Sequence, residues 1–343
     1  MRRIVIMFSI TVMLMSCMAQ IKYPKIPKST NDATIKGKLQ YPYKFKYEGN
    51  PLSRMHSATD PDVQVYNGEV WVYCGQDRKM DSINNRKGYD TMDGYHVFST
   101  KDMVNWTDHG EILHSSDVSW AIGGFLWAPG SAYKNGKYYL YYPLKDKNSQ
   151  WKIGVAIGET PAGPFKDSGK PIEGIGGIDP KIFIDDDEQA YIYNNPGIMA
   201  KLKPNMIELA EPTQKVMYGT PEIMSADTTR FSEGSYMHKR NGIYYYSYTC
   251  LRNKNNHGMY AMGKSPYGPW DWKGPLAPKP KPSGQNHHSI IEFKGQWYYF
   301  YHVAFPKNEF PKYKEGQGRI VCFDKLYYNA DGTIQLIKHT LGK

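Results

Sequence analysis

The chain has 343 residues, 14% of them aromatic, and contains 29 Tyr, 32 Gly and 23 Pro. This composition favours many short strands and tight turns, and excludes a protein built mainly from long helices. The net charge is +10, but Lys and Arg are spread along the chain and form no single stripe, which argues against a nucleic-acid-binding protein. A solvated basic surface is the simplest interpretation, and attraction to acidic glycans is the alternative.

The N-terminus has the pattern of a secretory signal. Arg2 and Arg3 precede an apolar segment, residues 4–15, that is too short to span a bilayer as a stable helix. Leu14-Met15-Ser16-Cys17 resembles a bacterial lipobox, in which the Cys becomes the lipidated first residue, although Met15 stands where a small residue is usual. We therefore expect residues 1–17 to be a signal peptide of the lipoprotein type, in preference to cleavage after Ala19.

Residues 18–40 are rich in Lys, Pro, Ser and Thr, and we expect them to form a flexible tether. This organisation predicts secretion across the inner membrane and attachment to the bacterial envelope through lipid on Cys17. Without lipidation the protein would be periplasmic or extracellular. The membrane is expected as a partner only through this anchor.

One short pattern, a turn followed by an aromatic strand, occurs five times at a spacing of roughly fifty to seventy residues. The copies are Asn67-Gly68-Glu69-Val70-Trp71-Val72-Tyr73, Asn135-Gly136-Lys137-Tyr138-Tyr139-Leu140-Tyr141, Asp187-Glu188-Gln189-Ala190-Tyr191-Ile192-Tyr193, Asn241-Gly242-Ile243-Tyr244-Tyr245-Tyr246-Ser247 and Lys294-Gly295-Gln296-Trp297-Tyr298-Tyr299-Phe300. A strand repeat of this length is typical of a propeller with one four-stranded sheet per repeat. The sequence therefore predicts an all-β, five-bladed β-propeller over residues 41–343.

The segments between the repeats support this blade count. The turn Thr160-Pro161-Ala162-Gly163-Pro164-Phe165 recurs two blades later as Ser265-Pro266-Tyr267-Gly268-Pro269-Trp270. Insertions at residues 76–94 and 117–125 are expected to be loops, the first of them over one face. Residues 319–336 should form the last strands, and we expect ring closure to pair an N-terminal segment with them.

Apart from Cys17, the chain contains Cys74, Cys250 and Cys322, with no CxxC spacing. An odd number of cysteines without such spacing implies neither a zinc site nor a disulfide framework. We expect three buried thiols on strands, with one surface pair as the alternative.

Counting back seven or eight positions from the repeated turns reaches five residues that can carry chemistry: Asp60, Trp127, Asp179, Glu233 and His287. Because the innermost strands of all blades converge on the propeller axis, equivalent positions are expected to face one cavity. A single acid of this kind is usually a turn or cap residue. Here Asp-Pro occurs at the same point of two repeats and Glu at that point of a third, which predicts one site with three carboxylates.

These motifs resemble glycoside hydrolase family 43. The similar segments are Asp60-Pro61, Trp127-Ala128-Pro129, Ile178-Asp179-Pro180, Ser232-Glu233-Gly234, Asn286-His287-His288-Ser289 and Asn329-Ala330-Asp331-Gly332. The resemblance runs from about residue 50 to the end of the chain. It implies an inverting five-bladed propeller enzyme that acts on arabinose- and xylose-containing glycans. Gly130 departs from the family, which commonly has Asp after Trp-Ala-Pro, and this difference is expected to affect substrate contacts more than the chemistry.

The resemblance also implies roles for the three acids. Asp60 would be the general base, Glu233 the general acid, and Asp179 a third acid that orients Glu233 and keeps it protonated near neutral pH. Inversion requires the base and the acid on opposite faces of the sugar, about 6.5–9.5 Å apart. A like charge beside the acid favours its protonated form.

The resemblance further implies that three other residues contribute to the substrate-binding cavity. Trp127 would form an apolar wall for a sugar ring, with a core aromatic as the alternative. Arg319 would contact substrate hydroxyls, with an ordinary surface Arg as the alternative. His287 would lie at the bottom of the cavity, where family members bind a structural calcium ion through water, although a lone inward His is more often a satisfied core residue.

The leading functional hypothesis is an exo-acting β-xylosidase or α-L-arabinofuranosidase that hydrolyses oligosaccharides or polysaccharides and needs no cofactor for its chemistry. The two insertions favour a pocket closed at one end and hence exo action. The alternatives are an endo-arabinanase or a galactan- or galactofuranose-directed member of the same family. A non-catalytic surface glycan-binding propeller would have lost one of the acids. A third class is the retaining five-bladed enzymes that cleave sucrose. They typically show an Arg-Asp-Pro motif, whereas this chain has Ile178-Asp179-Pro180, so we set this class aside.

Overall fold

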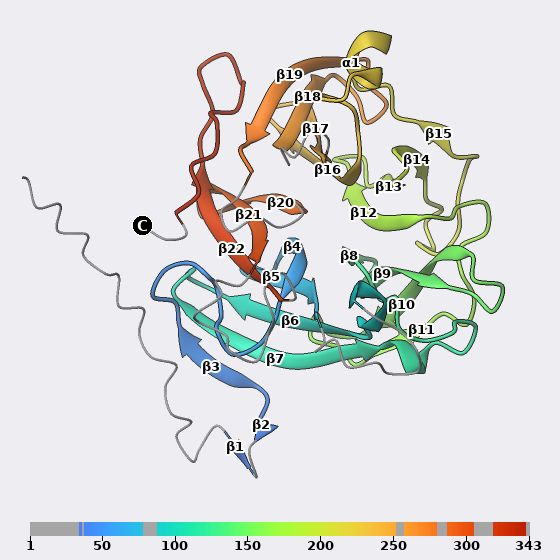
Figure 1. Ribbon diagram of the computed structural model, residues 1–343, viewed down its shortest axis with the longest axis vertical. Helices are drawn as coiled ribbons and strands as arrows, with labels where there is room; N and C mark the ends of the chain where they lie inside the picture. The colour runs from blue at the N-terminus through green and yellow to red at the C-terminus, as the bar shows by residue number, and fades with distance from the viewer. Residues whose placement is uncertain are drawn as a thin grey trace, which may run out of the picture.

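The structure is a computed structural model that describes residues 34–35, 38–77, 88–251, 257–279, 287–304 and 318–340. Within these residues five β-sheets surround a central axis (Figure 1), so the predicted five-bladed propeller is confirmed. Helix is confined there to α1 (Pro221–Ser225) and to two 3-10 turns, Gly88–Thr91 and Ser115–Asp117. In this part of the chain no helix has the length and apolar character needed to cross a membrane. The predicted signal peptide, Cys17 and most of the predicted tether lie outside the described residues.

All five sheets are antiparallel, and the first strand of each repeat is the innermost. Blade one has the order β3-β7-β6-β5-β4, and the other blades follow the chain outward from the axis. Blade one contains β3 (Tyr43–Lys46), β4 (Thr59–Tyr66), β5 (Glu69–Gly75), β6 (Gly94–Thr100) and β7 (Asn105–His114). Blade two contains β8 (Gly130–Lys134), β9 (Lys137–Lys145), β10 (Trp151–Gly158) and β11 (Phe165–Asp167).

Blades three to five complete the ring. Blade three contains β12 (Ile178–Ile184), β13 (Ala190–Asn195), β14 (Ile198–Lys201) and β15 (Gln214–Lys215). Blade four contains β16 (Glu233–Arg240), β17 (Ile243–Cys250), β18 (His257–Gly263) and β19 (Trp270–Ala277). Blade five contains β20 (His288–Phe293), β21 (Gln296–Ala304) and β22 (Arg319–Leu326). Outside the ring, β1 (Thr34–Ile35) pairs with β2 (Lys38–Leu39).

The repeated turn joins the first and second strands of each blade. At Asn67-Gly68, for example, both residues have positive φ (51° and 72°), and the Asn-Gly turns at 135–136 and 241–242 do the same. Two central residues with positive φ define the type I′ hairpin turn, whose twist matches that of the flanking strands. The local sequence thus sets where each inner hairpin reverses.

The hydrophobic core lies between neighbouring blades as five separate clusters. Tyrosines on second strands extend across these interfaces with their hydroxyl groups. Tyr73 donates to the carbonyl of Pro161 (2.8 Å), and Tyr193 donates to the carbonyl of Pro266 (2.9 Å). These carbonyls are the same position of the two repeated turns found in the sequence, so the repeated turn joins one blade to its neighbour.

Ring closure follows the sequence expectation, although the N-terminal segment forms no regular strand there. Segment 50–58 runs along β22, the outer strand of blade five: the N–H of Leu52 donates to the carbonyl of Val321 (2.8 Å), and the N–H of Ala58 donates to the carbonyl of Arg319 (2.9 Å). Strand β3, which precedes this segment, pairs with β7 on the outer edge of blade one. One buried cluster, which includes Val63 and Phe300, also packs blades one and five together.

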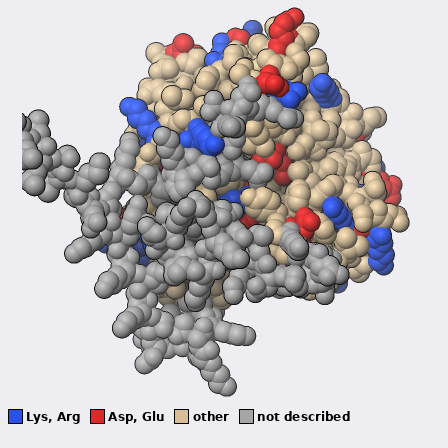
Figure 2. Space-filling model, viewed as in Figure 1, with Lys and Arg blue, Asp and Glu red and all other residues tan. Residues whose placement is uncertain are grey.

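The cysteines and the basic residues have the distribution that the sequence predicts. Cys74, Cys250 and Cys322 are free thiols, each buried and on a strand, as expected. On the face shown in Figure 2, the Lys and Arg side chains of the described residues are dispersed and form no continuous stripe. A solvated basic surface accounts for this distribution.

Candidate active site

The three predicted acids stand at the same irregularity of their inner strands. Asp60 (φ +53°) and Asp179 (φ +59°) have left-handed backbones, and Glu233 is followed by Gly234 (φ +65°). The register of each inner hairpin shifts here, between Thr59 and Asp62, Ile178 and Lys181, and Glu233 and Tyr236. Such bulges re-aim a side chain, and the proline after each Asp has no N–H to leave unpaired. The Asp-Pro motif therefore directs the Asp carboxylate toward the propeller axis.

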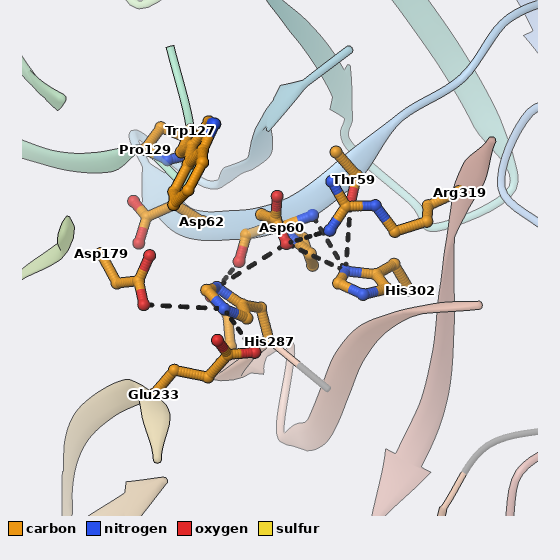
Figure 3. A network of polar contacts seen from close by, with 12 residues as sticks. Thr59, Asp60, Asp62, Trp127, Pro129, Asp179, Glu233, His287, His302 and Arg319 are labelled. Atoms are coloured by element: carbon orange, nitrogen blue, oxygen red, sulfur yellow. Dashed lines mark hydrogen bonds and ion pairs between the residues drawn. The ribbon is translucent and has the colours of Figure 1, made fainter. Parts of the chain in front are cut away.

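His287 lies between the three acids (Figure 3). Its Nδ1 is 3.7 Å from Asp60 Oδ1, and its Nε2 is 3.4 Å from Glu233 Oε1 and 3.7 Å from Asp179 Oδ2. Burial alone would lower the pKa of His287, but the carboxylates outweigh it and raise the pKa to about 9. At neutral pH the ring is therefore an imidazolium, with Asp60 and Glu233 on opposite nitrogens.

Asp60 is held by Arg319 and His302 on its other side. Arg319 Nη1 donates to Asp60 Oδ1 (3.1 Å), and His302 Nδ1 accepts the backbone N–H of Asp60 (3.1 Å). Burial favours the neutral acid, but Arg319, His287 and His302 together lower the pKa of Asp60 to about 2. Asp60 is therefore a carboxylate at neutral pH, which suits a proton acceptor.

The pKa of Asp179 is shifted in the opposite direction. Burial and the negative charges of Glu233 and Asp60 raise its pKa to about 6, against the opposing effects of His287 and the N–H of Gly234. Asp179 Oδ2 and Glu233 Oε1 are buried and have no hydrogen-bond partner among the described residues. Both oxygens are directed at the same nitrogen of His287.

Arg319 is fixed by a residue that the sequence did not reveal. Its Nε and Nη2 donate to the two oxygens of Asp77 (3.0 and 2.8 Å), and its guanidinium lies 4.5 Å from the ring centre of Tyr89. This paired geometry orients the remaining nitrogen, Nη1, toward Asp60. Arg319 is thus a buried part of the site and not a surface residue.

The pocket beside these groups has a volume of about 70 Å³. It is lined by Asp60, Tyr89, Met92, Trp127, Ala128, Ile178, Asp179, Glu233, His287 and Arg319. The first insertion meets the segment that follows the second along one wall: Trp127 Nε1 donates to the carbonyl of Tyr89 (3.0 Å), and the N–H of Leu126 donates to the carbonyl of Met92 (2.9 Å). This wall bounds one side of the pocket.

Comparison with known proteins identifies the family. The sequence model of "Glycosyl hydrolases family 43" matches residues 48–334. The chain belongs to glycoside hydrolase family 43. A xylosidase/arabinosidase of Bacteroides ovatus is 35% identical over 320 residues, which cover 81% of this chain and 94% of the relative. Xylosidase/arabinosidase 43A of Humicola insolens is 36% identical over 330 residues, covering 83% and 98%.

A solved family 43 structure has the same fold. It is a β-xylosidase/α-arabinofuranosidase from a compost microbial metagenome, in complex with xylotriose and in a calcium-free form. The TM-score is 0.76 at 33% identity, with 86% of this chain and 98% of that chain covered. The present chain is therefore a family 43 glycosidase over its whole propeller.

In this family 43 protein all six predicted site residues line the one pocket. His288, the neighbour of His287, is directed elsewhere, since its Nε2 bonds Ser247 Oγ (2.7 Å). Sequence reasoning missed Asp77, His302 and the wall residues Tyr89 and Met92. Only His302 carried a usable signal, because a histidine in the apolar run of β21 implies an internal partner.

Gly130 has a packing role in the structure. A Cβ atom there would lie 2.3 Å from the carbonyl oxygen of Pro180, which is far inside van der Waals contact. Gly130 begins β8 and Pro180 lies in β12, so the glycine permits close approach of blades two and three. It is not among the pocket-lining residues, and the expected effect on substrate contacts has no support in this position.

The donor set of the cavity fits a calcium ion poorly. Ligand atoms of Asp179, Glu233 and His287 lie within 4.8 Å of one another. Calcium, however, takes oxygen ligands, whereas both nitrogens of His287 face carboxylates and carry positive charge. The imidazolium already supplies a cation at this point, and we assign no catalytic step to a metal.

Proposed function

We propose that the protein is an inverting, exo-acting glycosidase, a β-xylosidase or α-L-arabinofuranosidase of arabinose- and xylose-containing oligosaccharides and polysaccharides. The observation that carries this proposal is the asymmetric set of acids around His287. One carboxyl, Asp60, has its pKa lowered to about 2, while another, Asp179, has its pKa raised to about 6. The lowered pKa of Asp60 suits a base, and Asp179, whose pKa is raised, approaches the same nitrogen of His287 as the proposed acid Glu233.

In the proposed reaction Asp60 removes a proton from water, and that water attacks the anomeric carbon. Glu233 delivers its proton to the glycosidic oxygen as the bond to the leaving sugar breaks. Arg319 and His287 keep Asp60 ionised. Asp179, which approaches the same nitrogen of His287 as Glu233 does, positions Glu233.

Exo action is supported by the wall of the pocket. Tyr89 and Met92 come from the first insertion, and hydrogen bonds join them to Trp127 and Leu126, which directly follow the second, beside the acids. A bounded pocket accepts a terminal sugar more readily than the interior of a chain. Trp127 offers the aromatic surface on which such a ring would rest.

The pentose specificity is supported by the names of the relatives, which are xylosidases and arabinosidases. The experiment is a panel of aryl β-D-xylosides, α-L-arabinofuranosides and β-D-galactofuranosides, with the product anomer followed by NMR. We expect cleavage of a pentoside with inversion. Preference for the galactofuranoside, or for internal bonds of arabinan, would favour the family alternatives; no hydrolysis of any substrate would favour a glycan-binding propeller.

The chemistry is proposed to need no metal. Exhaustive treatment with a calcium chelator should leave kcat on the preferred aryl pentoside unchanged, because His287 provides the positive charge between the acids. Activity lost on chelation and restored specifically by calcium would contradict this view.

We also propose export and lipid attachment through Cys17, which the lipobox-like Leu14-Met15-Ser16-Cys17 supports. Membrane fractionation of cells that express the full chain should place the protein in the envelope. The Cys17→Ser variant should lose the lipid and leave that fraction. An unchanged distribution of this variant would refute lipidation.

A further inference from the structure

A second cavity lies at the opposite end of the propeller axis from the acids. The acids occupy the first residues of β4, β12 and β16, whereas this cavity is formed by the later residues of all five inner strands, β4, β8, β12, β16 and β20. Its volume is about 480 Å³, within the range of sites for small organic ligands. We call this cavity the funnel.

The funnel and the active-site pocket are separated by a buried ion pair. Lys181 Nζ lies 2.9 Å from Asp62 Oδ1 and also donates to the carbonyl of Pro129 (2.8 Å). The side chains of both charged residues are at most 3% exposed. Ser131 donates to the other oxygen of Asp62. Because this cluster joins blades one, two and three across the axis, a ligand in the funnel cannot be the sugar being cleaved.

A buried polar atom in the funnel wall lacks a partner. His238 lines the cavity and is 6% exposed; its Nε2 bonds the hydroxyl of Tyr328 (2.8 Å), but its Nδ1 has no partner among the described residues. Burial lowers the pKa of His238 to about 3, so the ring is neutral. Because Nδ1 is itself buried, His238 gives the funnel wall a neutral ring and no exposed hydrogen-bonding atom.

The remaining lining indicates the chemical class of the ligand. Aromatic rings stand on different sides of the cavity, among them Tyr133 on β8, Phe183 on β12 and Trp297 on β21. Lys239 is neutralised by Asp185 (2.6 Å) and Asp186 (2.8 Å), so it offers no free positive charge to a phosphate or carboxylate. The carboxylate of Glu292 also lines the funnel and disfavours an anion.

We propose that the funnel is a second carbohydrate-binding site, which holds a neutral stretch of the same polysaccharide that the active site trims. Aromatic rings would stack on sugar rings, and Glu292 would bond hydroxyl groups. A second attachment point raises the effective concentration of chain ends at the active site. The choice of xylan-type glycan rests on the proposed function.

The test uses affinity electrophoresis of the full chain in gels containing soluble arabinoxylan. Asp60→Asn serves as the parent because it should bind without hydrolysis, and Glu233→Gln is a second parent should the first fail to fold. Tyr133→Ala and Glu292→Gln are then added to the parent. Tyr133 is 41% exposed and Glu292 is an exposed side chain, so neither change is expected to disturb the core.

We expect the Tyr133→Ala and Glu292→Gln variants to bind arabinoxylan about tenfold more weakly, as the loss of one aromatic or hydrogen-bonded contact implies. Tyr327→Ala, at a 52% exposed tyrosine outside the funnel, is the matched control and should be retarded like its parent. In the active enzyme the same funnel changes should leave kcat/KM on an aryl pentoside unchanged.

Equal retardation of the parent and both funnel variants would overturn the proposal. Retardation by another neutral glycan but not by arabinoxylan would overturn the assigned ligand. Loss of aryl-pentoside activity in the funnel variants would show that the two sites are not separate. The proposed function would be contradicted by a different result, namely that the unmodified enzyme does not hydrolyse pentosides. The two failures are therefore distinguishable.

Discussion

At the scale of single residues, the site depends on one buried cation placed among three carboxyl groups. His287 contacts all three, and Arg319 adds a second positive charge on the far side of Asp60. Because each acid meets a different balance of burial and charge, chemically similar side chains acquire different proton affinities. The roles proposed for the acids can be separated by substitution.

The first prediction distinguishes the acid from the base by the leaving group. Glu233→Gln should lower cleavage of natural glycosides by about 10²–10⁴-fold but spare much of the activity on aryl glycosides, whose phenolate needs little protonation. Asp60→Asn should lose both activities, because water activation is needed in either case. Steady-state kinetics on paired substrates measures this difference, and equal losses on both substrates in the Glu233 variant would contradict the assignment.

The second prediction concerns Asp179. Removal of its negative charge in Asp179→Asn should move the alkaline limb of the kcat/KM profile to lower pH, because the acid catalyst then loses its proton more easily. The raised pKa of Asp179 means that its ionised form is costly to bury, so a neutral Asn should not lower the thermal midpoint. A lower midpoint with an unmoved alkaline limb would instead make Asp179 a structural turn residue.

At the scale of elements, the site depends on how closely inner strands approach one another. β8 and β12 come together at Gly130, where a Cβ atom would meet Pro180 at 2.3 Å. Pro180 directly follows Asp179. A shift of β12 to relieve this contact would therefore displace one of the acids.

The third prediction uses this contact. Gly130→Ala should destabilise the fold by about 1–3 kcal/mol, as overpacking of a tight interface does, and should also lower kcat. Gly258→Ala is the matched control, since Gly258 is also a buried strand glycine but its added Cβ would meet neighbours only at 3.4 Å. Chemical denaturation of both variants measures the effect, and equal stability of the two would refute the packing role of Gly130.

At the scale of the whole molecule, the charged site couples stability to pH. The pKa of His287 is about 9 in the folded protein and 6.5 as its ordinary value, so its contribution is complete below pH 6.5 and is lost as pH rises through 9. The pKa of Asp60 is about 2 against 3.8, so its contribution is present above pH 4 and is lost as pH falls toward 2.

The fourth prediction follows from His287. The free energy of unfolding should fall by about 3 kcal/mol between pH 6 and pH 10 through this residue, given 1.36 kcal/mol per pKa unit. In His287→Gln this part of the decline should disappear. Urea unfolding at the two pH values provides the measurement, and an identical decline in the variant would assign the pH dependence to other groups.

The sequence by itself determined the five-bladed architecture and the common position of the acids. Both are local and periodic: the Asn-Gly turns of three repeats have positive φ at the same point, and the Asp-Pro bulges recur at one point of the inner strand. Such features need only neighbouring residues, so they are visible in one sequence.

The tertiary structure alone decided which residues surround the acids. Asp77 holds Arg319 across 242 residues of sequence, and His302 reaches Asp60 from blade five. The funnel likewise exists only where five inner strands converge. These contacts depend on the closed ring, which brings distant segments together in a way that no local pattern or periodicity encodes.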